Sequence, residues 1–209
     1  MPARLVCSAF SLTLIIMSSA RAAEPKVLFE DTFTDKLAPG WTWLRENPKA
    51  WRIKDGALEI RVEPGFAEAV KNALLRPAPD RSKGKLAIEV TVTNLTPPTN
   101  QWEQAGLTLY RDEKPVMKFV KELVDGTVKI VPPETPFDGN TVQLRWLIDG
   151  DAWTAQYRPD AKGDFKTAAT GKLPPPGKDD QISIQCYHGP PNAEHWIRFD
   201  DFRILQLAE

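Results

Sequence analysis

Residues 104–110 read Gln-Ala-Gly-Leu-Thr-Leu-Tyr, and this stretch decides the fold class. The apolar residues Ala105, Leu107 and Leu109 occupy every second position. Successive side chains of a β-strand point to opposite faces, so a period of two predicts a strand with one face in a core. The same alternation recurs in four further stretches: 58–63, 86–93, 142–148 and 182–187.

Turn signals separate these stretches. Three Asp-Gly pairs predict two-residue hairpins: 55–56, 125–126 and 149–150. Proline accounts for 19 of the 209 residues and clusters at 97–98, 132–133, 174–176 and 190–191. Proline cannot donate to a strand ladder, so these clusters predict loops. Only residues 66–75 lean toward helix. The pattern predicts an all-β fold of two antiparallel sheets in one domain.

The composition excludes several classes of protein. Lys and Arg number 27 against 28 Asp and Glu, a net charge of −1. A basic stripe for nucleic acid is therefore not expected. Scattered prolines exclude a long helical bundle. Hydrophobic residues make up 42% of the chain, enough for a buried core.

The N-terminal segment predicts export. Arg4 precedes an apolar run over residues 5–17 and an Ala20-x-Ala22 cleavage site, so residues 1–22 are predicted to be a signal peptide. The run is shorter than the ~20 apolar residues of a membrane span. We expect a secreted or periplasmic domain of residues 23–209, with no membrane span after cleavage. Its net charge is −3, because the segment carries two arginines. Its one cysteine, Cys186, is predicted to be buried filler without a disulfide partner.

Three motifs carry a resemblance to known families. Residues 29–33 read Phe-Glu-Asp-Thr-Phe, residues 102–107 read Trp-Glu-Gln-Ala-Gly-Leu, and residues 199–204 read Phe-Asp-Asp-Phe-Arg-Ile. Together with Lys118 and the Glu-Leu-Val-Asp-Gly run at 122–126, they resemble concanavalin A-like sandwich domains of the uncharacterised family labelled "regulation of enolase". The chain is also similar to C-terminal sandwich domains of some β-xylosidases and to domains named for 3-keto-disaccharide hydrolysis. The resemblance implies a jelly-roll sandwich and a link to carbohydrate, without implying catalysis.

The outward positions of the strands suggest a ligand-binding face. Amides and carboxylates can bond to the hydroxyl groups of an oligo- or polysaccharide, and aromatic rings can stack on its C–H faces. Trp102 precedes the polar face of the 104–110 stretch and is the best stacking candidate. An ordinary solvated sandwich face is the alternative. The predicted ligand-binding residues are Trp102, Gln104, Tyr110, Lys118, Glu122, Gln185 and Tyr187.

Glu122 is the candidate catalytic residue if the protein is an enzyme. Four positions along a strand separate the Cα atoms of Lys118 and Glu122 by roughly 13 Å, which predicts no direct ion pair. Glycosidases use two carboxyl groups, and no Glu-x-Asp-x-Glu strand is present. The sequence therefore favours binding without turnover. A glycoside hydrolase with Glu122 as general acid or base, and a structural or protein-binding envelope sandwich, are the alternatives.

Acidic residues near the two ends of the domain suggest a structural calcium ion. Calcium accepts carboxylate and carbonyl oxygens, and the terminal strands of a sandwich often pair. The alternative is that the Phe-Asp-Asp-Phe run only caps a strand exit. The two histidines, His188 and His195, are too few for a histidine-rich metal site, and no other cofactor is expected. The candidate calcium ligands are Glu30, Asp31, Asp200 and Asp201.

Overall fold

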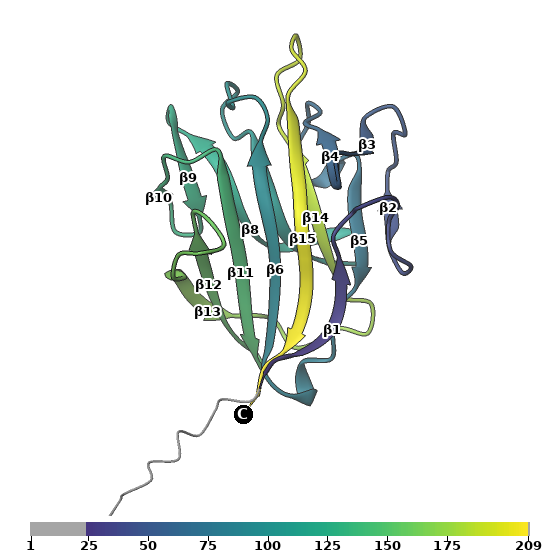
Figure 1. The fold of residues 1–209 in the computed structure, drawn as a ribbon, viewed down its shortest axis with the longest axis vertical. Coiled ribbons are helices and arrows are strands. Elements are labelled where there is room, and N and C mark those ends of the chain that lie inside the picture. The colour runs from purple at the N-terminus through teal and green to yellow at the C-terminus, as the bar shows by residue number, and fades with distance from the viewer. Residues whose placement is uncertain (1–23, 209) are drawn as a thin grey trace, which may run out of the picture.

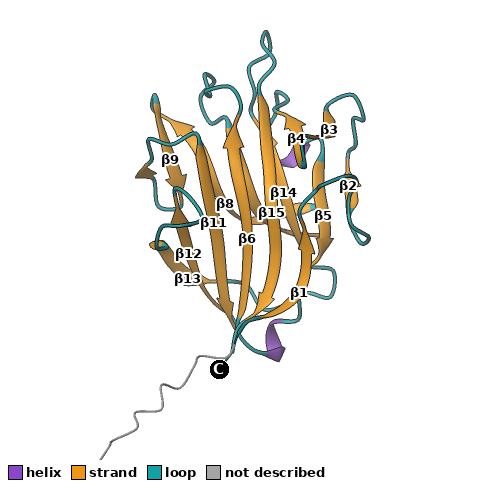
Figure 2. Cartoon of the chain, viewed as in Figure 1, coloured by secondary structure: helices purple, strands orange, loops and turns teal. Residues whose placement is uncertain are grey.

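The computed structural model describes residues 24–208, which form two antiparallel β-sheets packed face to face (Figure 1). Helix is almost absent (Figure 2), and the described part holds two short 3-10 turns, η1 (Ala67–Ala69) and η2 (Arg81–Lys83). The predicted all-β sandwich is confirmed. Within residues 24–208 no helix is long and apolar enough to cross a membrane. The predicted signal peptide, residues 1–22, lies outside the described residues.

Sheet A contains β1 (Lys26–Asp31), β3 (Trp51–Lys54), β4 (Ala57–Arg61), β6 (Leu86–Asn94), β11 (Thr141–Asp149), β12 (Ala152–Arg158), β13 (Lys166–Lys172) and β15 (Trp196–Gln206). Its strand order is β13-β12-β11-β6-β15-β4-β3, with β1 also paired to β15. The central strands β6 and β15 are far apart in the chain, so their pairing is a long-range contact.

Sheet B contains β2 (Thr42–Leu44), β5 (Ala73–Pro77), β7 (Gln104–Arg111), β8 (Lys114–Val124), β9 (Thr127–Val131), β10 (Thr135–Pro136) and β14 (Gln181–Tyr187). Its strand order is β10-β9-β8-β7-β14-β5-β2. The five stretches predicted from alternation correspond to β4, β6, β7, β11 and β14.

The core fills the space between the two sheets. Leu107 of sheet B and Trp146 of sheet A are fully buried, as the period of two predicts. Cys186 is buried and free, so its predicted role as core filler is confirmed. Gly106 lies in β7 where the strands approach closely: a Cβ atom there would lie 2.5 Å from the Phe119 carbonyl oxygen. Only glycine fits that position.

Two of the three predicted hairpin turns form at the expected residues, 55–56 and 125–126. In the third, Asp149 pairs with Ala152, so the turn is Gly150-Asp151, one residue later than predicted. Gly150 has a φ of 60°. A glycine with positive φ at the first turn position is what a type II′ hairpin requires. Residues 66–75 form η1 and then β5, so the helical leaning yields a single 3-10 turn.

The closing Phe-Asp-Asp-Phe run forms a β-bulge in β15. The register against β6 slips by one residue between Asp200 and Arg203. Because of this extra residue, Phe199 and Phe202 both lie in the core although they are three positions apart. Asp201 has a φ of 49° at the bulge. β4 pairs with β15 before the bulge and β1 pairs with it afterwards, so the bulge marks the change of partner.

Candidate functional site

The outer face of sheet B, which is turned away from the core, carries six of the seven predicted ligand-binding residues. β8, β7 and β14 are consecutive strands of the sheet. The register places Gln104 opposite Glu122 of β8 on one side and opposite Tyr187 of β14 on the other. Tyr110 lies near the far end of β7, opposite Gln181. All six side chains therefore lie on the same face of sheet B, but their surroundings differ.

Gln104, Lys118 and Glu122 form a closed set of hydrogen bonds, called here the polar ring. Lys118 Nζ donates to Gln104 Oε1 at 2.9 Å and to Glu122 Oε2 at 2.8 Å. Gln104 Nε2 donates to Glu122 Oε1 at 2.9 Å. The prediction that Lys118 and Glu122 do not pair directly is wrong. The flexible lysine stem lies along the strand face and bridges the separation of the two backbones.

Tyr110, Gln185 and Tyr187 lie on the predicted face, but beneath other residues. Residues 62–72, called here the covering segment, connect β4 to β5 and pass over this part of the sheet. Val70 packs with both tyrosines in a second apolar cluster, separate from the main core. Tyr110 is 0% exposed, and its hydroxyl donates to Gln185 Oε1 at 2.8 Å. Tyr110, Gln185 and Tyr187 are therefore not surface residues, contrary to the prediction.

The burial of the two tyrosines changes their acidity. Desolvation raises the pKa of Tyr110 to about 12, partly offset by the hydrogen bond to Gln185. Desolvation also raises the pKa of Tyr187, and the charge of Glu122 adds to the effect. Both phenols are thus neutral packing groups at physiological pH.

An aromatic rim borders the polar ring. Phe66 of the covering segment lies 4.6 Å from His188 between ring centroids, and Trp102 lies 5.8 Å from His188 on another side. Both contacts are edge-to-face, a favoured geometry for aromatic pairs. Phe66 is 62% exposed and Trp102 is 49% exposed, so this rim is an apolar surface open to solvent. Single apolar side chains on a surface are ordinary, whereas a cluster of large ones marks a candidate binding site.

The backbone at the rim is strained. Trp102 has a φ of 64° and His188 a φ of 66°. Positive φ is uncommon for bulky residues and clusters at functional sites. Hydrogen bonds hold Trp102 in this conformation: its N–H donates to the Leu123 carbonyl at 2.7 Å, and its carbonyl accepts from Gln104 Nε2 at 2.9 Å. The polar ring and the stacking residue are thereby fixed to each other.

A buried Glu103–His195 pair anchors the loop that carries Trp102. Glu103 Oε1 lies 2.8 Å from His195 Nδ1. Its other oxygen accepts from the N–H groups of Thr99 and Asn100 at 3.0 and 3.3 Å. The Asn100 side chain donates to the carbonyl of His188 at 2.8 Å, which ties the two loops of the rim together. This pair holds the site in shape without facing the open surface.

Exposure divides the predicted residues into two sets. Trp102 and, partly, Lys118 reach solvent, whereas Gln104 and Glu122 are only 4% and 5% exposed. Burial lowers the pKa of His188, opposed by the charge of Glu122, so its imidazole is neutral at pH 7. A ligand on this surface therefore meets neutral aromatic rings and one fixed ammonium group.

The side chains of two of the four predicted calcium ligands, Asp31 and Asp200, have other partners. β1 and β15 do pair, which brings the two acidic segments together. Asp31 accepts hydrogen bonds from Phe33 N, Ala38 N and Trp41 Nε1, each at 2.8 Å. Asp200 accepts from the N–H of Asp201, and Glu30 pairs in register with Arg203. Residues 24–208 contain no group of three or more His, Cys, Asp or Glu side chains suited to a metal. The calcium ion stays a prediction that this geometry does not support.

Sequence reasoning missed Phe66, Glu103 and the rim role of His188. His188 directly follows the 182–187 strand and precedes a Gly-Pro-Pro turn, a context typical of a turn residue. Phe66 follows Gly65 in a segment with no alternation. Neither pattern indicates that residues 62–72 cross the outer face of sheet B, because that contact joins residues far apart in sequence.

Fold and surface together define a two-sheet β-sandwich domain with an aromatic and polar patch on the outer face of one sheet. No protein-family model matches the chain, and no curated protein matches its sequence. The resemblance to the "regulation of enolase" family is therefore not supported.

Solved structures share the fold at low sequence identity. The chain is similar to the GH43 protein BlXynB of Bacillus licheniformis, with 16% identity and a TM-score of 0.64 over 84% of this chain and 39% of that chain. A xylan β-1,4-xylosidase of Bacillus halodurans C-125 shows 14% identity and a TM-score of 0.64 over 92% and 41% of the two chains. The alginate lyase AlgAT5 of polysaccharide lyase family 7 shows 10% identity and a TM-score of 0.55 over 79% and 93%. This chain thus spans about two fifths of each of the two Bacillus proteins. The likeness to β-xylosidase sandwich domains holds at the level of fold.

Proposed function

We propose that this protein is an exported carbohydrate-binding domain that holds an oligo- or polysaccharide at the aromatic rim without cleaving it. One observation carries the proposal: Phe66 and Trp102 are exposed and both contact His188, beside the polar ring that fixes the ammonium group of Lys118. Sugars have apolar C–H faces and hydroxyl edges, and this surface offers a partner for each.

The polar ring serves the binding role by fixing Lys118. Two of its ammonium hydrogens are directed at Gln104 and Glu122, which leaves a third for a ligand hydroxyl. A preorganised donor loses little side-chain entropy on binding. Removal of Glu122 therefore weakens binding by releasing Lys118, even though the carboxylate itself is nearly inaccessible.

The same contacts favour binding over turnover. Both oxygens of Glu122 already accept hydrogen bonds within the protein. A glycosidase acid or base must reach the scissile bond, together with a second carboxyl group. Glu122 is buried and bonded to Lys118 and Gln104 instead. Its geometry is that of a group that positions a neighbour.

The structural neighbours support a carbohydrate as the ligand class. Their names describe a GH43 protein, a xylan β-1,4-xylosidase and an alginate lyase, all of which act on carbohydrate. Export, proposed from residues 1–22, would bring the domain into contact with polysaccharide outside the cytoplasm.

The test is affinity electrophoresis of the protein in gels that contain xylan, xyloglucan or alginate. We expect retardation by at least one polysaccharide, lost in Trp102→Ala and reduced in Lys118→Met. Leu28→Ala removes an equally exposed apolar side chain elsewhere and is expected to behave as wild type. No binding to any glycan at millimolar concentration would contradict the proposal and favour a structural or protein-binding role.

A sugar-release assay on the same polysaccharides tests turnover. We expect no release. Release that disappears in Glu122→Gln would show a glycan-active enzyme with Glu122 in the reaction. Release that survives this change would place a reaction elsewhere, and either result contradicts binding without turnover.

A further inference from the structure

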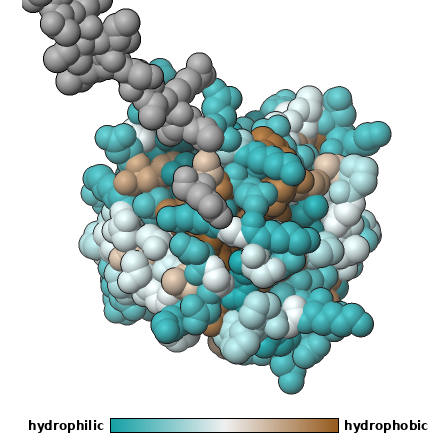
Figure 3. Space-filling view, turned by 90° about the horizontal axis from the view of Figure 1, so that it is seen from below, coloured by the Kyte–Doolittle hydropathy of each residue, from teal (hydrophilic) through white to brown (hydrophobic). Residues whose placement is uncertain are grey.

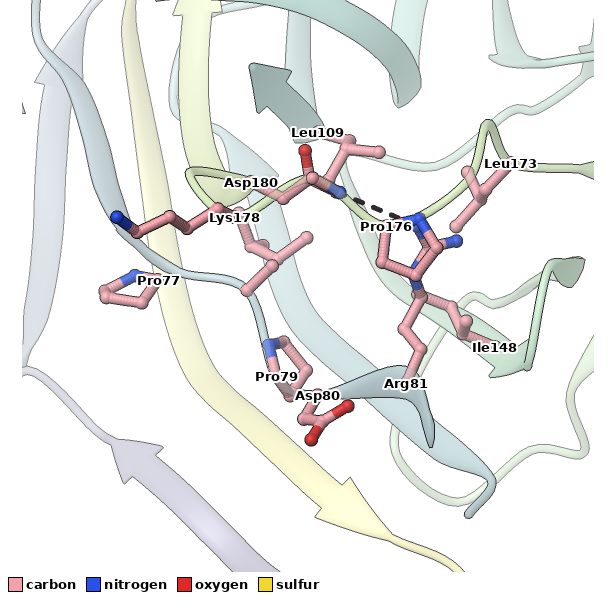
Figure 4. Close-up of a pocket in the computed structure, with 13 residues that line it drawn as sticks. Pro77, Pro79, Asp80, Arg81, Leu109, Ile148, Leu173, Pro176, Lys178 and Asp180 are labelled. Carbon is pink, nitrogen blue, oxygen red and sulfur yellow. Dashed lines mark hydrogen bonds and ion pairs between the residues drawn. The ribbon is translucent and has the colours of Figure 1, made fainter. Parts of the chain in front are cut away.

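A separate pocket lies at the opposite end of the sandwich from the aromatic rim. Its apolar floor comes from both sheets: Leu109 of β7 and Ile182 of β14 on one side, and Ile148 of β11 on the other (Figure 4). All three are at most 3% exposed. This end of the molecule shows hydrophobic surface between hydrophilic side chains (Figure 3). The cavity volume is about 250 Å³.

A buried arginine closes this pocket. Arg81 of η2 is 8% exposed. Its guanidinium donates to the Pro174 carbonyl at 2.9 Å, and a second contact to the Gly150 carbonyl is long, at 3.5 Å. Arginine has five N–H donors, so most of its hydrogen-bonding capacity is not used by these two oxygens.

Two carboxylates, Asp180 and Asp151, attract Arg81, and the one that lines the pocket, Asp180, is already used by another arginine. Asp180 accepts from Arg111 Nε at 2.8 Å and Arg111 Nη2 at 3.1 Å. It also accepts from the Gly177 N–H at 2.9 Å. The nearest Arg81–Asp180 approach is 3.7 Å, beyond hydrogen-bond distance (Figure 4). Two guanidinium groups thus share one carboxylate.

The hydrogen bonding of Arg81 in the pocket is therefore incomplete, although the lining carries two cations, Arg81 and Lys178, and two carboxylates, Asp80 and Asp180. Lys178 lines its mouth and is exposed, and the only other acidic residue in the lining, Asp80, lies 3.3 Å from Lys83 and accepts from Ser82. Desolvation lowers the pKa of Arg81, and the repulsion of Arg111 works in the same direction, against the attraction of Asp180 and Asp151. A buried charge with incomplete pairing is costly, so an anionic ligand would stabilise this end of the protein.

We propose that this pocket binds a small organic carboxylate, with its acid group on Arg81 and its apolar body against Leu109, Ile148 and Ile182. Carboxylates match the planar fork of a guanidinium group. A cavity of about 150 Å³ lined by apolar side chains holds benzene. The larger volume here accommodates a benzoate-sized molecule.

This site is independent of the carbohydrate proposal. Gln104 and Tyr187 pair at one end of β7 and β14, whereas Leu109 and Ile182 pair at the other. Five positions along a strand correspond to about 17 Å. A ligand of this size cannot contact both sites.

The experiment is a methyl NMR titration of the protein at pH 7 with benzoate, and with benzamide as the uncharged equivalent. We expect benzoate to shift the Ile148 and Ile182 methyl signals and to bind about tenfold or more tightly than benzamide, the difference expected for a charge-assisted hydrogen bond. Inorganic phosphate, which has the charge without an apolar body, is expected to bind more weakly than benzoate.

Arg81→Gln is expected to weaken benzoate binding about tenfold or more, for the same reason. Because Arg81 is buried and this variant can lose stability, exposed Lys178→Glu provides a second test at the pocket mouth. Lys162→Glu makes the same charge change at an exposed position outside the pocket and is expected to leave binding unchanged. Trp102→Ala is also expected to leave it unchanged.

Three results would overturn the proposal. The first is that benzoate shifts neither methyl signal at millimolar concentration. The second is that benzamide or phosphate binds as tightly as benzoate. The third is that Lys178→Glu and Lys162→Glu have equal effects. None of these results affects the polysaccharide retardation assay, so the two proposals fail separately.

Discussion

The outer face of sheet B has two halves that share strands but differ in environment. The open half contains the polar ring and Trp102, and each side-chain nitrogen and oxygen of the ring has a hydrogen-bond partner. The covered half lies beneath residues 62–72. There Tyr110 is fully buried, and two buried atoms, Gln185 Nε2 and Thr108 Oγ1, have no partner.

The difference shows what each half contributes. The covered half buries two tyrosines against Val70 and its neighbours, so it contributes stability through apolar area. In the open half, the polar groups of Gln104 and Glu122 fix the Lys118 ammonium group and the Trp102 loop beside solvent. Stability and ligand binding are therefore expected to respond to different substitutions on the same face.

Tyr110→Ala is expected to have the largest effect. Truncation of a fully buried aromatic side chain costs about 3–5 kcal/mol of unfolding free energy. Glycan affinity of the folded protein is expected to be unchanged, because the side chain does not reach the surface. Urea denaturation and affinity electrophoresis measure the two quantities. Lost glycan binding in a variant that is still folded would show that the two halves act together.

The second largest effect is expected at alkaline pH, which lowers the free energy of unfolding by ionising Tyr110 in the covered half. The pKa of Tyr110 is raised from 10.0 to about 12, so its contribution is complete below pH 10 and is lost as pH rises through 12. A rise of two in the pKa corresponds to about 2–3 kcal/mol of unfolding free energy. Unfolding free energies between pH 9 and about 12 should fall in the wild type. The fall should be smaller in Tyr110→Phe, which has no ionisable hydroxyl.

Trp102→Ala is expected to lower glycan affinity about tenfold, or 1.4 kcal/mol, with stability changed by less than about 0.5 kcal/mol. Because residue 102 has a positive φ, Trp102→Gly should be the more stable variant by up to about 1 kcal/mol. Thermal melts and glycan titrations of the pair separate backbone strain from stacking. Equal stability of the two would mean that the strain is small.

Thr108→Val is expected to have the smallest effect and the opposite sign. The Thr108 hydroxyl is buried without a partner, and an unpaired buried hydroxyl costs about 1–3 kcal/mol. Valine has nearly the same shape, so we expect a gain of about 1 kcal/mol in denaturant titrations. A loss instead would show that a water molecule or other partner satisfies the hydroxyl.

The sequence predicted the parts of the site that follow from local pattern. The period of two assigned Gln104, Lys118 and Glu122 to one face, and the position of Trp102 before that face marked it as the stacking residue. The same period failed at Phe199 and Phe202, where an inserted bulge residue changes the parity. It also gave no indication that Tyr110 would be covered, because residues 62–72 contact it only through the tertiary fold.

What the sequence alone determined is the strand alternation, the hairpin turns and hence the all-β class, because these depend on neighbours within a few residues. Only the tertiary structure decided which outward residues remain at the surface, that Lys118 reaches Glu122, and that Arg81 meets an already occupied Asp180. The physical reason is that burial and charge pairing are set by segments that meet across long stretches of chain. The period of two specifies the direction of a side chain but not what lies above it.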